Sequence, residues 1–106
     1  MRHASVAVKR REEMEPDRAA FLAEILRALA HPVRLRIVAL LCRGDTHVNN
    51  IAESLGVPQP IISQQLRILR MTRLVDVSRE KGLAVYRIVE PRLHSLLKCM
   101  EGCGAS

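Results

Sequence analysis

The spacing of apolar residues predicts helices over most of the chain. Leu22, Ile25, Leu26 and Leu29 recur every three or four positions, which predicts a first helix beginning at Pro16. That helix closes at His31-Pro32, because the residue before a proline disfavours the α region. Residues 1–15 are polar, charged and aperiodic. We therefore expect residues 1–15 to form a disordered arm and residues 16–106 to form one domain.

Three further helices follow, each with its own stop signal or apolar stripe. The second is predicted over 32–42, with Val33, Ile37, Leu40 and Leu41 inward and with Arg34 and Arg36 outward. A third runs over 48–55 and ends at Gly56, a residue type that favours helix C-termini. A fourth runs over 59–71. Two helices separated by a short, Gly-containing turn are typical of a helix-turn-helix.

The period changes after Leu74. The segments VDVSR, EKG and LAVYRI predict a strand, a turn and a strand, which together make a two-stranded wing. Pro91 opens a fifth helix, whose apolar stripe consists of Leu93, Leu96, Leu97 and Met100. The predicted fold is mainly α with a small β-hairpin wing, a winged helix-turn-helix of five helices.

Charge is unevenly distributed along the 106 residues. The chain carries a formal charge of +6, and residues 59–87 hold six basic and two acidic side chains, so that this stretch alone contributes +4. A concentrated positive charge suits a polyanionic partner. The N-terminal sequence lacks the apolar run of a signal peptide, and no stretch is long and apolar enough to span a membrane. We expect a cytoplasmic protein with no membrane partner.

The face of the fourth helix opposite its apolar stripe is the candidate DNA-reading surface. Helical spacing places Ile62, Leu66 and Leu69 on one stripe, and it places Pro60, Ser63, Gln64 and Arg67 on the opposite side, with Gln59 at the tip. Gln pairs with adenine, Ser serves several bases, and Arg takes guanine or phosphate. On the wing, Arg79, Lys81 and Arg87 are expected to contact phosphates. For Gln64 or Arg67 taken alone, an ordinary solvated face is equally compatible.

Several motifs in order give a specific resemblance. LRALAHPVRLRIVALL, HVNNIAESLGV, PQPIISQQLRILR, LV and a YRI strand together resemble the ArsR family of winged-helix repressors over about residues 20–100. The resemblance implies a homodimer formed by the first and last helices, which binds double-stranded operator DNA at an inverted repeat and is released by an inducer. Pro58 replaces a typical N-cap Ser, and Gln65 stands where the family often has His.

The signal is a separate question, because family members sense at different sites. The arsenite and cadmium pattern places Cys-Val-Cys where this chain has HVNNIAESL, which contains no Cys. The zinc pattern of the last helix is also missing, since Glu90, Pro91 and Arg92 replace its first pair and no His follows His94.

Cys99 and Cys103 remain as candidate sensors. They are four positions apart and share a face if the last helix continues past Gly102. Thiolates suit arsenite, antimonite, cadmium or zinc, with Cys42 or the other subunit as a further ligand source. A disulfide or polysulfide bridge formed by reactive sulfur species is equally compatible. Cys42 ends an apolar run and is also typical of a packing residue. No cofactor is expected to be required.

Two other classes of function compete with an inducible repressor. An enzyme is disfavoured, because the sequence has no phosphate-binding glycine loop, nucleophile elbow or paired carboxylates in a cleft-forming region. A protein-binding winged helix, or a DNA-binding regulator with purely structural cysteines, is the remaining alternative. A protein-binding domain has no need of the basic stretch at 59–87.

Overall fold

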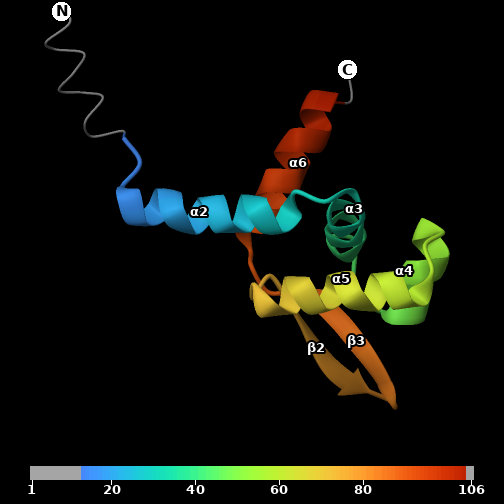
Figure 1. The fold of residues 1–106 in the computed structure, drawn as a ribbon. Coiled ribbons are helices and arrows are strands. Elements are labelled where there is room, and N and C mark those ends of the chain that lie inside the picture. The colour runs from blue at the N-terminus through green and yellow to red at the C-terminus, as the bar shows by residue number, and fades with distance from the viewer. Residues whose placement is uncertain (1–12, 105–106) are drawn as a thin grey trace, which may run out of the picture.

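The computed structural model describes residues 13–104, with side chains through Glu101. Along this part of the chain the order is α2 (Pro16–Leu29), α3 (Pro32–Leu41), β1 (Thr46–His47), α4 (Val48–Leu55), α5 (Gln59–Met71), β2 (Val75–Glu80), β3 (Leu83–Ile88) and α6 (Arg92–Gly104). Figure 1 shows α2 and α6 at one end of the molecule, while the β2–β3 hairpin projects beyond α5 at the other end. The predicted winged helix-turn-helix of five helices is confirmed within the described residues. The arm predicted at 1–15 falls mostly outside them.

Two helices begin at histidine N-caps. The Nδ1 atom of His31 accepts a hydrogen bond from the backbone N–H of Val33 at 3.1 Å, at the start of α3. The Nδ1 atom of His47 accepts one from the N–H of Asn50 at 3.3 Å, at the start of α4. Both caps satisfy N–H groups that a helix leaves without internal partners. These histidines therefore fix where α3 and α4 begin.

The turn between α4 and α5 depends on Gly56. This residue has φ 67°, the left-handed conformation that glycine adopts at low cost, and the N–H of Val57 donates to the carbonyl of Ala52 at 3.1 Å. The chain then enters α5 through Pro58, whose side chain makes no cap hydrogen bond. Its carbonyl instead accepts from the N–H groups of Ile61 and Ile62. The helix thus starts without the Ser cap that the family often has.

The wing is the larger part of a three-stranded antiparallel sheet, in the order β1-β3-β2. The strands β2 and β3 are joined by the two-residue turn Lys81-Gly82, where φ is 54° and 82°. Positive φ at both positions is what a type I′ hairpin turn requires. The short strand β1 pairs through Thr46 and His47 with Tyr86 and Val85 of β3. This third strand, which apolar spacing did not predict, attaches the wing to the start of α4.

One aliphatic core holds these elements together. Its fully buried members come from α3, α4, α5 and α6. They are Ile37, Val38, Ile51, Ile62, Leu66, Leu69 and Leu93. Helix α5 packs against both α3 and α4. The prediction that Arg34 points outward is wrong, because its side chain is half-buried and donates to groups of α2 and α5.

Helix α6 is anchored at its first turn. The carboxylate of Glu90 accepts hydrogen bonds from the backbone N–H of Arg92 at 3.0 Å and from its Nε at 2.9 Å. These bonds hold the pKa of Glu90 below its ordinary value. The Arg92 guanidinium also lies 4.6 Å from the ring centre of Phe21, which ties α6 to α2. Within residues 13–104, the structure contains no helix that is both long and apolar enough for a membrane span.

Candidate nucleic-acid interface

Helix α5 has one buried face and one exposed face. Ile62, Leu66 and Leu69 are completely buried, as the apolar stripe predicts. The site residues predicted from the sequence, Gln59, Pro60, Ser63, Gln64 and Arg67, are all exposed. The structure therefore brings these five side chains onto one solvent-facing surface, which we call the reading face. A DNA major groove is wide enough to admit an α-helix that presents such a face.

Sequence reasoning missed Ile61 on this face. Its side chain is 41% exposed, although isoleucine is usually buried, and it lies three positions before Gln64 on the same helix. A branched apolar side chain among polar readers suits contact with the methyl group of thymine. The signal was present in the sequence, because Ile61 falls outside the stripe of Ile62, Leu66 and Leu69.

The wing presents its cations around a strained turn. Arg79 and Lys81 are both exposed, and the Nη1 atom of Arg79 donates to the carbonyl of Gly82 at 3.0 Å. Lys81 occupies the left-handed region, which costs a residue with a Cβ about 1 kcal/mol or more. Asn or Gly would occupy this turn position with less strain. The turn therefore presents the charge of Lys81 to solvent despite the strain of its backbone.

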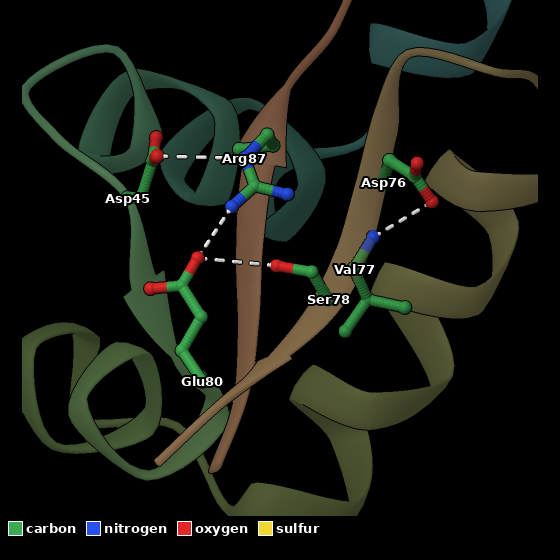
Figure 2. A network of polar contacts seen from close by, with 6 residues as sticks. All are labelled: Asp45, Asp76, Val77, Ser78, Glu80 and Arg87. Atoms are coloured by element: carbon green, nitrogen blue, oxygen red, sulfur yellow. Dashed lines mark hydrogen bonds and ion pairs between the residues drawn. The ribbon is translucent and has the colours of Figure 1, made fainter.

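Arg87 differs from the other wing cations, because two carboxylates already engage its guanidinium. Its Nη2 atom lies 2.8 Å from Glu80 of β2, and its Nε lies 3.5 Å from Asp45, in the loop before β1 (Figure 2). The hydroxyl of Ser78 also donates to Glu80, at 3.2 Å. This set, which we call the wing network, links the wing to the lead-in of α4. It competes with the phosphate contact predicted for Arg87.

Gln65 lies inside the fold and not on the reading face. It is 8% exposed, and its Oε1 accepts a hydrogen bond from Nη1 of Arg34 at 2.8 Å. The Nε of Arg34 also donates to the carbonyl of Ala28, at the end of α2. Gln65 therefore makes a contact between α3 and α5, and it does not join the residues of the reading face.

The three candidate sensing cysteines occupy two helices. Cys42 is half-buried at the C-cap of α3, and Cys99 is exposed on α6; neither forms a disulfide. The backbone of α6 is helical through Gly104, so the helix continues past Gly102, but the side chain of Cys103 lies outside the described part. Burial and the carboxylate of Glu101 raise the pKa of the Cys42 thiol. Among the residues whose side chains are described, no group of three His, Cys, Asp or Glu is placed to hold a metal.

Comparison with known proteins gives consistent matches. The sequence pattern of the bacterial regulatory proteins of the ArsR family matches residues 31–77. A biofilm growth-associated repressor of Xylella fastidiosa (strain Temecula1) is 36% identical over 100 residues, which cover 94% of this chain and 87% of the relative. The chain belongs to the ArsR family. It is therefore a winged helix-turn-helix transcriptional regulator and not an enzyme.

Solved structures of ArsR-type regulators share the fold over most of its length. The crystal structure of the transcriptional repressor BigR from Xylella fastidiosa matches with a TM-score of 0.78 and 33% identity, over 82% of this chain and 89% of that one. The homodimeric winged helix-turn-helix domain of Mb0332 from Mycobacterium bovis matches with a TM-score of 0.73 and 28% identity, over 87% and 88%. The domain thus has the ArsR architecture from α2 to α6.

Proposed function

We propose that the chain is a homodimeric repressor of the cytoplasm, which inserts the first turns of α5 into the major groove of an operator. The observation that carries the proposal is the reading face, where the five predicted residues are exposed on a helix whose opposite face is fully buried. Gln59, Ser63, Gln64 and Arg67 would read base edges, with Pro60 and Ile61 against thymine methyl groups. Arg79 and Lys81 would bind the flanking phosphates and supply affinity without sequence choice.

The proposed dimer pairs α2 and α6 of two copies. A groove between these helices is lined by Leu22, Ile25, Leu26, Leu93 and Leu96, together with Arg92. Leu26 is 52% exposed, and Phe21 and Met100 are also exposed large apolar residues of the same two helices. Covering such a surface stabilises a small domain. A two-fold dimer presents two reading faces and therefore binds an inverted repeat. The solved structure of Mb0332, described as homodimeric, supports this arrangement.

The DNA-binding proposal is tested on the gene's own upstream DNA. Fluorescence anisotropy with that duplex and with a scrambled duplex of equal length gives two dissociation constants, measured at low and at high salt. We expect tighter binding to the upstream duplex and a steep loss of affinity with salt, because phosphate contacts release counterions. A protein-binding winged helix would instead give weak affinity for both duplexes and a flat salt profile.

We further propose that the inducer acts at Cys99 and Cys103, with Cys42 as a third candidate. Cys99 is exposed, and the continuous helix of α6 puts Cys103 one turn later. The candidate inducers are of two kinds: reactive sulfur species, and the thiol-binding ions arsenite, antimonite, cadmium and zinc. Burial, together with the carboxylate of Glu101, raises the pKa of the Cys42 thiol, which lowers its tendency to form the reactive thiolate. Cys42 is therefore a weaker candidate than the exposed Cys99, and it would serve either as an additional ligand or as a packing residue only.

The sensing proposal is tested by adding each inducer in parallel to the complex with upstream DNA. We expect one of them to release the DNA, and we expect the Cys99→Ser/Cys103→Ser double variant to bind DNA normally but to resist release. Cys42→Ser is measured in parallel: loss of release in this variant would include Cys42 in the sensing site, and normal release would leave it a packing residue. Undiminished release from the double variant would leave the cysteines of α6 with a structural role.

A further inference from the structure

A single polar residue interrupts the buried face of the recognition helix. Among the residues whose exposure is described, Gln65 is the one polar or charged side chain that counts as buried, and it lies next to Leu66 on α5. Its partner is a charged group from another helix, since Arg34 of α3 donates Nη1 to Oε1 of Gln65 at 2.8 Å. No buried polar side-chain atom of the described residues is left without a partner. The contact is thus fully satisfied within the fold.

Arg34 joins three helices through one rigid guanidinium. Its Nη1 reaches α5, its Nε reaches the carbonyl of Ala28 in the last turn of α2, and its own backbone belongs to α3. The guanidinium is planar, with its donors at fixed angles. The two acceptors are therefore held at set positions relative to one another. We call this arrangement the Arg34 tie.

A directional hydrogen bond can fix the rotation of α5 about its own axis more sharply than apolar packing does. Apolar packing around Ile62 and Leu66 has no required angle, so it fixes the rotation of α5 less sharply than a directional contact does. A buried hydrogen bond with a charged donor weakens steeply when its angle changes. Gln64 precedes Gln65 directly and points to solvent. The rotation that keeps Gln65 on Arg34 therefore also sets the direction of the reading face.

We propose, on the basis of the DNA-binding function above, that Arg34 and Gln65 are positioning residues that fix the rotation of α5 relative to α2. The acceptor in α2 belongs to the helix that we assign to the dimer interface, so a shift of α2 acts on Arg34 and through it on the recognition helix. The tie sets sequence discrimination, because base-edge contacts need accurate geometry. Phosphate contacts, which are less directional, depend on it much less.

The test is a double-mutant cycle with two duplexes. The variants Gln65→Leu, Arg34→Met and the combination of both are measured against the upstream duplex and the scrambled one, together with their thermal unfolding. We expect Gln65→Leu to weaken binding to the upstream duplex by about 5- to 30-fold, with the scrambled duplex and the salt dependence unchanged. The combined variant should lose little more than either single variant, because the two residues act as one unit.

Two further variants separate positioning from stability. Gln65→Glu keeps an acceptor of the same shape and should preserve discrimination between the duplexes. Leu69→Val, a packing change on the same buried face, should lower the melting temperature but keep the ratio of the two affinities. Should Gln65→Leu fail to fold, Gln65→Glu and Arg34→Lys still report on the tie, since only the second changes the fork geometry.

The outcomes distinguish the tie from the function on which it rests. Wild-type protein that binds both duplexes equally would contradict the proposed repressor function. Wild-type discrimination that is retained in Gln65→Leu, or abolished equally in Leu69→Val, would overturn the positioning role alone. Additive losses of affinity in the combined variant would do the same.

Discussion

The recognition helix α5 and the wing both present cations at the proposed DNA surface, but they are held in different ways. Helix α5 is held by its own completely buried residues, such as Leu66, and by one partly buried hydrogen bond from Arg34 to Gln65. The base of the wing is also buried, since Val75 of β2 is 2% exposed, but toward its tip the wing network joins Arg87 to two exposed carboxylates. Salt screens exposed ion pairs much more than buried contacts. In the proposed complex, sequence reading thus comes from the rigid element, and the adaptable element supplies charge.

The largest expected effect is on the free energy of unfolding, when apolar side chains of α5 and of the wing are deleted in turn. Leu66→Ala on α5 should lower the free energy of unfolding by about 2 to 5 kcal/mol, because the deletion leaves a cavity in a core that is fully buried there. Leu83→Ala, at a wing position that is 48% exposed, should change it by less than about 0.5 kcal/mol. Urea denaturation followed by circular dichroism measures both. Equal losses of stability would mean that the wing belongs to the same cooperative core.

The next effect concerns DNA and compares one cation from each element. Arg67→Ala should weaken binding to the upstream duplex by about 1 to 3 kcal/mol and leave a scrambled duplex nearly unaffected. Arg79→Ala on the wing should weaken both duplexes alike and reduce the salt slope by about 1 for each phosphate that the wing no longer binds. Anisotropy titrations at several salt concentrations give these values. A uniform decrease in affinity in Arg67→Ala would assign Arg67 to phosphate instead of a base edge.

At the wing turn, one substitution is expected to raise stability and to lower DNA affinity, both by small amounts. Lys81→Asn should stabilise the hairpin by up to about 1 kcal/mol, because Asn adopts the left-handed conformation with less strain. The same change should weaken DNA binding, because it removes one wing cation. Lys81→Arg is the matched control, since it keeps both the charge and the strain. Thermal unfolding and anisotropy titrations on the same samples measure stability and DNA affinity. A Lys81→Asn variant that lost both, or gained both, would contradict the prediction.

The smallest effect is expected in the wing network. Asp45→Asn removes the 3.5 Å ion pair with Arg87, whose side chain is 31% exposed against 53% for Asp45. Because exposed pairs contribute little, stability should fall by less than about 1 kcal/mol, and the difference should vanish at high salt. Affinity for both duplexes should rise slightly, because one negative charge beside Arg87 is removed while Glu80 still engages its guanidinium. A large, salt-independent loss of stability would show that the wing is as firmly held as α5.

The secondary structure of this chain follows from local patterns in its sequence. Pro32 and Gly56 mark helix boundaries by their own backbone preferences, and Lys81-Gly82 marks the hairpin turn. Apolar spacing assigned Ile62, Leu66 and Leu69 to the interior of α5, and the same spacing exposed Ser63, Gln64 and Arg67. These features depend on neighbours a few residues away, so the sequence alone reveals them.

Other features join residues that are distant in the sequence. Strand β1 exists because Thr46 and His47 meet β3, and a two-residue segment has no periodicity of its own. Arg34 was expected outside from its helical position, yet it faces Gln65, 31 positions later, because α3 and α5 pack together. Arg87 likewise counts as a free cation in the sequence, but Asp45 and Glu80 neutralise it in space.

The reading face depends both on the local sequence of α5 and on the packing of distant helices. The sequence alone determined which side chains α5 exposes, because a helix of fixed pitch sorts its own residues into faces. Only the tertiary structure decided that hydrogen bonds from Arg34 connect this helix to α2 and α3, because such bonds exist only after the helices have packed.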